Sequence, residues 1–105
     1  MTKKLAEEKF SQAVSFNSLP VFLDSHSNVS VQIVAKNGTA LASTVKLQVG
    51  NDINFWEDLA GSSATISGTA GSQFYDIQTN AGQMRVVVTI TGGVADFKID
   101  YVLKK

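Results

Sequence analysis

The stretch that decides the fold is Gln83–Lys105, which reads QMRVVVTITGGVADFKIDYVLKK. On both sides of Gly92-Gly93, apolar residues recur at every second position, a period typical of strands with one buried face. Two glycines between two such runs predict a two-residue hairpin turn. We therefore expect an antiparallel hairpin whose strands cover residues 83–91 and 94–103.

The hairpin has one register that keeps its apolar residues together. If Thr91 faces Val94, Arg85 lies opposite Asp100 on the outer face, and a slip by one residue would turn the apolar set outward. We expect a shared core face made of Met84, Val86, Val88, Ile90, Ala95, Phe97, Ile99 and Tyr101.

Two upstream segments show the same alternation. VSVQIVAK, residues 29–36, and VKLQV, residues 45–49, place their odd-numbered residues inward. A two-residue turn at Asn37-Gly38 would instead bring even-numbered residues inward in the second segment. One residue must be absorbed, so a β-bulge or a wider loop is expected between Thr39 and Thr44.

The expected fold is all-β: a single antiparallel β-sandwich, jelly-roll-like, with about eight or nine strands. Further strands are predicted over residues 10–16, 19–23, 63–67 and 73–78. With 105 residues, the chain has room for one domain and one core. The predicted core comprises Val31, Ile33, Val45, Leu47, Val49, Ile66, Ile77, Val86, Val88, Ile90, Phe97, Ile99 and Tyr101.

Residues 1–9 differ from the rest, so the predicted division is an arm or frayed terminus, 1–9, and a sandwich domain, 10–105. Lys3 with Glu7 and Lys4 with Glu8 have helical i,i+4 spacing, but a helix this short is marginal in water. Two interpretations stay open: a solvated, frayed terminus, or an arm that becomes ordered against a neighbouring subunit.

Composition excludes several classes of function. Nine basic and nine acidic residues give zero formal charge, so no field attracts nucleic acid. Cysteine is absent, which excludes disulfides and thiolate chemistry. MTKKLAEEKF lacks the apolar region of a signal peptide, and no run of apolar residues is long enough to span a membrane.

No constellation of residues predicts catalysis, a cofactor or a metal site. Asp24, His26 and Asn28 alternate, but a calcium loop would need glycine and glutamate where Val29 and Ala35 stand. A serine triad would need a strand–turn–helix elbow, which the pattern does not offer. Acids near residues 52–58 could suggest glycoside hydrolysis, but adjacent residues on a strand point to opposite faces. We expect a protein that is not an enzyme.

Trp56, the only tryptophan, lies among acids and amides in QVGNDINFWEDL, residues 48–59. Phe55 is expected on the opposite face of the same strand. A lone tryptophan in a sandwich usually belongs to the core or an interface, because its burial removes a large area from water. The alternative is a carbohydrate-binding module in which Trp56, with Phe55 or Tyr75, stacks on a sugar.

Several phrases of the chain resemble a known class of proteins. They are LQVGNDINFWEDL, then GSSATISG, SQFYDIQTNAG and QMRVVVTITGGVADFKIDYVLKK, preceded by VSVQIV. Together they are similar to small β-sandwich structural proteins of tailed bacteriophage virions, which serve as capsid decoration, neck or tail components. The resemblance covers residues 10–105. One departure is Gly50, where such sequences often have serine before Asn-Asp.

The resemblance implies a non-enzymatic virion protein, made in the host cytoplasm, that binds and stabilises a capsid, neck or tail assembly. It further implies a homo-oligomer, either a trimer or a ring, in contact with capsid or tail subunits. The residues expected to contact these partners are Lys3, Lys4, Leu5, Phe10 and Trp56. Lys98, Lys104 and Lys105 are expected to protect an edge strand from wrong pairing.

Overall fold

The computed structural model describes residues 2–24 and 26–104, and every regular element in these ranges is a strand. The strands are β1 (Thr2–Gln12), β2 (Phe16–Asn17), β3 (Val21–Phe22), β4 (Asn28–Asp52), β5 (Phe55–Asp58), β6 (Ala64–Gly68), β7 (Gly71–Gln78) and β8 (Gln83–Lys104). Met1 of the predicted arm and Lys105 of the predicted domain lie outside the described residues, as does Ser25. None of the residues that the structure describes forms a helix long and apolar enough to cross a membrane.

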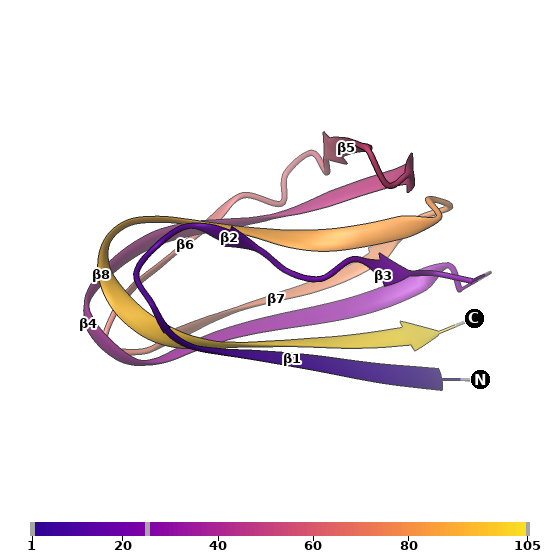
Figure 1. Cartoon of the computed structure of the whole chain (residues 1–105). Coiled ribbons are helices and arrows are strands. Elements are labelled where there is room, and N and C mark those ends of the chain that lie inside the picture. The colour runs from indigo at the N-terminus through magenta and orange to yellow at the C-terminus, as the bar shows by residue number, and fades with distance from the viewer. Residues whose placement is uncertain (1, 25, 105) are drawn as a thin grey trace.

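Two long strands, β4 and β8, form the centre of the molecule. They pair antiparallel from Asn28 opposite Lys104 to Gly50 opposite Gln83. Both strands bend over at one end of the molecule, while the two termini lie at the other end (Figure 1). The ribbon is therefore folded onto itself, and its two halves lie face to face.

The folded ribbon gives two layers. Layer one contains β1, the second half of β8, the first half of β4, and β7, in that order. Layer two contains β2 and β3, the first half of β8, the second half of β4, and β5 with β6. This order is that of a jelly roll, and the predicted antiparallel β-sandwich with eight strands is confirmed.

The predicted hairpin at Gly92-Gly93 is wrong. The chain bends there and continues, so Val88 pairs with Val45 and Phe97 pairs with Ala35, both on β4. Consequently Arg85 and Asp100 lie in different layers instead of opposite each other. The predicted inner faces are nevertheless correct, because the glycine pair shifts the alternation by one residue whether the chain turns back or bends over.

The irregularity predicted in β4 is confirmed. Its register with β8 shifts between Thr39 and Ala42 and again between Ala42 and Ser43, and a further shift lies between Lys36 and Thr39. Asn37 and Ala40 have positive φ angles of 54° and 50°. These shifts let odd-numbered residues face the core on both sides of the bend.

The core lies between the two layers and consists of their inner faces. The predicted core residues are buried, except Val49, Ile77 and Ile90, which are partly buried and pack against the core. The prediction also missed some buried residues, including Leu23 at 1% exposure and Leu41 at 4%. An edge-to-face contact between Phe16 and Phe97, with ring centroids 5.4 Å apart, joins the layers.

The amino-terminal residues form an edge strand of the sandwich. β1 pairs with β8 from Thr2 opposite Lys104 to Lys9 opposite Phe97, so the predicted boundary between residues 9 and 10 falls inside it. The described part of the predicted arm is therefore paired, not frayed. β8 itself is a central strand, so the expected edge protection by Lys98 and Lys104 is wrong.

Candidate functional site

A network of polar side chains covers the outer face of layer two. Gln48 on β4 lies between Asp58 on β5 and Arg85 on β8, because it is paired with both residues. Its amide nitrogen donates to Asp58 Oδ1 at 2.8 Å, and its amide oxygen accepts from Arg85 Nε at 2.8 Å. Lys46 Nζ donates to Asp58 Oδ2 at 3.0 Å. We call Lys46, Gln48, Trp56, Asp58 and Arg85 the Trp56 patch.

Trp56 belongs to this surface and not to the core. The carbon of the Arg85 guanidinium lies 4.3 Å from the centroid of its ring, a cation–π contact. The indole N–H donates to the carbonyl oxygen of Ile53 at 3.0 Å. One ring face and the only polar atom of the side chain are thus already engaged, which leaves less of Trp56 for a sugar than the sequence suggests.

Fixed charges accompany the tryptophan. The hydrogen bond from Gln48 and then that from Lys46 hold the pKa of Asp58 below its usual value. Asp58 is therefore ionised at neutral pH, between the cations Lys46 and Arg85. Arginine and tryptophan are the residue types that contribute most to binding energy at protein interfaces. In the Trp56 patch these two residue types are in direct contact.

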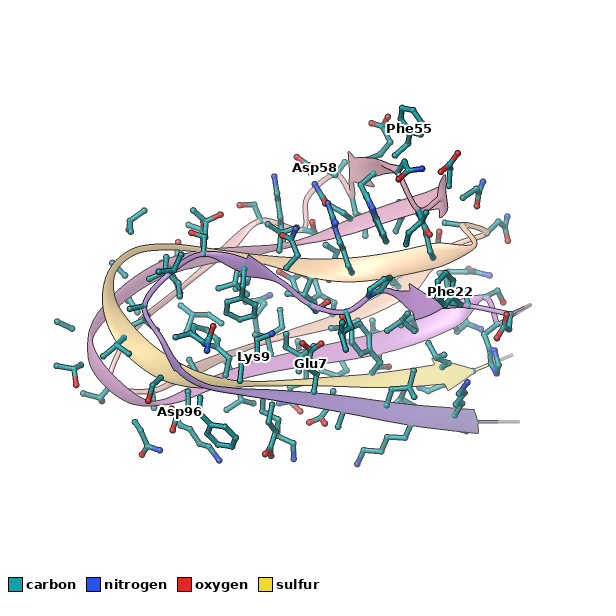
Figure 2. The ribbon with its side chains drawn as sticks, in the orientation of Figure 1. Glu7, Lys9, Phe22, Phe55, Asp58 and Asp96 are labelled. Atoms are coloured by element: carbon teal, nitrogen blue, oxygen red, sulfur yellow. The ribbon has the colours of Figure 1, made fainter. Side chains whose placement is uncertain are left out.

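Exposed apolar residues extend the patch along one end of layer two. Phe55 is 72% exposed and Ile53 is 50% exposed. In Figure 2, Phe55 projects from β5 away from the body of the molecule. Apolar surface is therefore exposed next to Trp56 in the chain.

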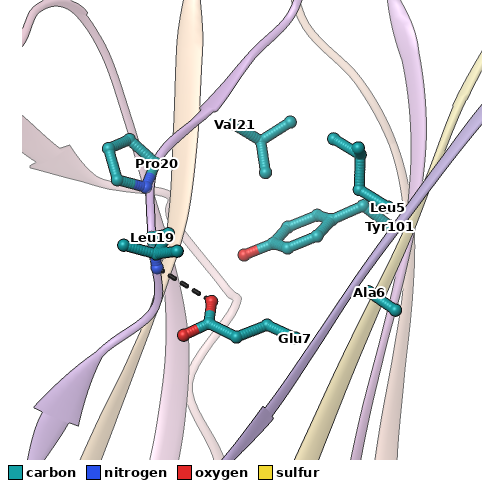
Figure 3. Close-up of a pocket in the computed structure, with 7 residues that line it drawn as sticks. All are labelled: Leu5, Ala6, Glu7, Leu19, Pro20, Val21 and Tyr101. Carbon is teal, nitrogen blue, oxygen red and sulfur yellow. Dashed lines mark hydrogen bonds between the residues drawn. The ribbon is translucent and has the colours of Figure 1, made fainter.

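A second candidate is a small cleft between the edge of layer one and the β2–β3 segment of layer two (Figure 3). We call it the β1 cleft. Its volume is about 200 Å³, and Glu7 accepts a hydrogen bond at 2.9 Å from the backbone N–H of Leu19 across it. It is lined by Leu5, Ala6, Glu7, Leu19, Pro20, Val21 and Tyr101.

Tyr101 and Ser18 join the two layers beneath the β1 cleft. The Tyr101 hydroxyl lies 2.7 Å from Ser18 Oγ, which also accepts a hydrogen bond from the backbone N–H of Val86 at 2.8 Å. Burial raises the pKa of Tyr101 to about 12. The hydroxyl is thus a neutral structural partner and not an acid or base for catalysis near pH 7.

The residues predicted to contact partners do not form one surface. Lys4 and Phe10 point outward from β1, and Phe10 is 61% exposed. Leu5 points inward and lines the β1 cleft. Lys3 lies on β1 two residues before Leu5, whereas Trp56 lies on β5 in the other layer. Whether any of them touches a partner stays a prediction.

His26 lies in the turn before β4 and is 8% exposed. Its Nδ1 is 2.8 Å from the carbonyl oxygen of Leu23. Within residues 2–24 and 26–104, no group of three or more histidine, cysteine, aspartate or glutamate side chains is placed to hold a metal ion.

Sequence reasoning missed most of the Trp56 patch. It placed Trp56 on the strand face opposite Phe55, but did not bring Gln48 or Arg85 to it. The predicted hairpin register placed Arg85 opposite Asp100. Only the pairing of β8 with β4 places Arg85 beside Gln48. The alternation in residues 45–49 pointed Gln48 and Lys46 outward and was the available signal.

Comparisons with known proteins show the fold. The sequence matches no protein-family profile and no curated protein. Among solved structures, the chain is similar to the SPBc2 prophage-derived protein YomS, with a TM-score of 0.58 and 10% identity over 98% of this chain and 94% of that one. It is also similar to a chain of infectious bursal virus-derived T=1 particles, with a TM-score of 0.57 and 9% identity. That match covers 99% of this chain and 31% of the other.

A third similar structure is described as "CBM4 structure and function". Its TM-score is 0.53 at 12% identity, over 81% of this chain and 56% of that chain. At such identities the three matches establish a shared β-sandwich architecture, which hosts many unrelated functions. They do not distinguish virion proteins from carbohydrate-binding modules.

Proposed function

We propose that the protein is a non-enzymatic structural component of a tailed-phage virion, which binds and stabilises a capsid, neck or tail assembly. The observation that carries the proposal is the likeness to the prophage protein YomS, which extends over nearly the full length of both chains. The likeness to a chain of virus-derived T=1 particles supports it.

The surface chemistry supports the same proposal. The Trp56 patch combines an arginine–tryptophan contact, fixed charges of both signs and exposed apolar neighbours. Such a surface fits a protein partner better than a nucleic acid, because the chain has no net positive charge. In this proposal, the patch contacts a capsid or tail subunit, and Lys3, Lys4, Leu5 and Phe10 of β1 contribute further contacts.

Co-sedimentation with tailed-phage particles stripped of their accessory proteins tests the proposal. We expect saturable binding and a defined oligomer, a trimer or a ring, when light scattering measures the mass of the purified chain. A decorating protein stabilises a shell only if it prefers the assembled state. Bound particles should therefore resist heat better than stripped ones.

Variants connect binding to the surface. Trp56→Ala with Arg85→Ala should weaken capture, whereas Phe22→Ala, which truncates an exposed phenylalanine on β3 outside the Trp56 patch, should not. A chain that stays monomeric and ignores every particle would contradict the virion role. In that case, a shift of Trp56 fluorescence on titration with glycans would favour the carbohydrate-binding alternative.

A further inference from the structure

We propose that a shallow groove on the outer face of layer one binds a single sugar ring. We call it the Phe74 groove. Its volume is about 130 Å³. It lies in the opposite layer from the Trp56 patch and is lined by Lys4, Ser30, Gln32, Phe74, Asp100 and Val102.

Strand register assembles the groove from distant parts of the sequence. Gln32 on β4 is paired with Phe74 on β7 and with Asp100 on β8. Asp100 is paired on its other side with Ala6 of β1. Side chains paired in this way point to the same face, so a carboxyl group, an amide and an aromatic ring form one row.

The main evidence for a ligand is an unsatisfied hydrogen-bond acceptor on Asp100. Its Oδ1 atom is buried and has no hydrogen-bond partner among the described residues. The carboxyl groups of Asp58 and Asp96, which also lie on outer faces, each accept two hydrogen bonds. A buried acceptor without a donor is costly, and such atoms normally have a partner. Because the atom is covered in the free protein, a ligand hydroxyl supplies that donor once the side chain that covers it moves aside.

The other lining residues match a sugar. Phe74 is 57% exposed, and its ring offers an apolar face on which the C–H face of a sugar can lie. Gln32 both donates and accepts hydrogen bonds, whereas the Ser30 hydroxyl already donates to Asp76 Oδ1 at 3.4 Å and accepts from Lys104 Nζ at 3.5 Å. Lys4 and Asp100 have opposite formal charges, which favours a neutral ligand with many hydroxyls over a cation or an anion. The groove is small beside typical ligand pockets of about 300–1,000 Å³, so it fits one ring.

The Trp56 patch does not offer this chemistry. The polar groups of Gln48, Asp58 and Arg85 are already paired with one another, and the indole N–H is paired with Ile53. No buried polar atom of that patch lacks a partner within the described residues. Of the two surfaces, the Phe74 groove is therefore the sugar site.

Titration of the ¹⁵N-labelled full chain with methyl glycosides of glucose, galactose and N-acetylglucosamine tests the proposal, followed by NMR amide shifts. We expect saturable shifts at Gln32, Phe74 and Asp100 for at least one probe, with a dissociation constant of order 1 mM. Phe74→Ala should abolish these shifts, and Asp100→Asn should weaken binding roughly tenfold. The matched control is Phe22→Ala, which truncates an exposed phenylalanine of layer two and should leave sugar binding unchanged.

Three outcomes would overturn the proposal. They are shifts that cluster around Trp56 instead, binding of an arginine amide in preference to every glycoside, and no binding either to the three glycosides or to a broad glycan array. The proposal does not depend on the virion role. Particle capture without glycan binding would refute the groove alone, and glycan binding without capture would refute the virion role alone.

Discussion

The two layers of the sandwich share one core but differ at their edges. Layer one ends in long strands, β1 with 11 residues and β7 with 8. Layer two ends in fragments: β2 and β3 have 2 residues each, β5 has 4 and β6 has 5. The central strands are equally apolar inside, so the difference arises at the edges.

Serine side chains complete the edges of layer two. Ser18 donates its backbone N–H to the Val86 carbonyl, and its Oγ accepts from the Val86 N–H. On the opposite edge, Leu59 N–H donates to the Leu47 carbonyl, and Ser62 Oγ accepts from the Leu47 N–H. Each pair of bonds imitates one step of a strand ladder. Central backbone groups are thus satisfied without a long edge strand.

Layer one protects its edge differently. Glu7 and Lys9 point inward from β1 and form an ion pair, with 3.6 Å between Lys9 Nζ and Glu7 Oε2. The ammonium group of Lys9 also lies over the ring of Phe16. Inward-pointing charges on an edge strand discourage pairing with another chain. Charges thus protect one layer and the shortness of the strands protects the other.

Val88→Asp should abolish the folded state of both layers together. Val88 is fully buried, at 0% exposure, in the pair of long strands that the layers share. The aspartate would place an unpaired charge in their common core. The expected result is no soluble protein, or a far-UV circular dichroism spectrum without β structure. Loss of layer two alone would show that the layers fold independently.

Gly93→Ala should destabilise the protein by about 3 kcal/mol. Gly93 has a φ of 74°, and a Cβ there would overlap the carbonyl oxygens of Thr39 and Ala40 where the two bends cross. Gly92→Ala is the matched control, because its Cβ would meet only the Ala42 Cβ at 3.8 Å. Urea unfolding measures both variants. Equal, large effects would instead indicate a hairpin turn with positive φ at both glycines.

High pH should weaken the link between the layers at Tyr101. Its pKa is about 12 in the folded state and about 10 in the unfolded chain, so only the unfolded state loses the proton in between. The stabilising contribution is complete below pH 10 and is lost as the pH rises to about 12, by roughly 2–3 kcal/mol. Urea unfolding of wild type and Tyr101→Phe across this window should show a smaller decline in the variant. Parallel declines would contradict the assignment.

Ser18→Ala should lower the free energy of unfolding by about 2 kcal/mol, because it leaves the buried N–H of Val86 and the Tyr101 hydroxyl without their partner. Ser72→Ala on β7 is the control in layer one. Ser72 is exposed there, and its substitution should change stability by less than about 0.5 kcal/mol. Similar values for the two serines would remove the distinction between the edges.

Arg85→Asp should lower stability by only about 1 kcal/mol, because it removes a surface hydrogen bond and a cation–π contact at a half-buried position. Thermal unfolding measures the loss, and Trp56 fluorescence reports whether the ring becomes mobile. An effect as large as that of Val88→Asp would mean that the inner and outer faces are misassigned.

The wrong hairpin prediction shows which features the alternation of apolar and polar residues can predict and which it cannot. Alternation identified the inward faces of residues 83–91 and 94–103 correctly, because it depends only on which side chains avoid water. It could not identify their partners, because a bend and a turn at Gly92-Gly93 preserve the same faces. Pairing with β4 depends on residues that are far apart in the chain, from Gly50 opposite Gln83 to Asn28 opposite Lys104.

The first strand shows the opposite limit. Residues 1–9 carry charges at helical i,i+4 spacing, and the sequence predicts for them a frayed terminus or an arm that becomes ordered against a neighbouring subunit. Residues 2–12 form a strand because the edge of β8 offers unpaired backbone groups, and β1 satisfies them regardless of its side chains. Tertiary context overrode local propensity at this edge.

By itself, the sequence determined an all-β domain, the inward residues of its central strands and the irregularity in β4, because burial of apolar side chains imposes a period of two. Only the tertiary structure decided which strands pair, where Arg85 meets Trp56, and how Phe74, Gln32 and Asp100 come to share one groove. The physical reason is that the hydrophobic effect is non-directional, so the buried face of a strand follows from the local alternation of its apolar residues. Strand register, in contrast, depends on hydrogen bonds between residues that are far apart in the chain.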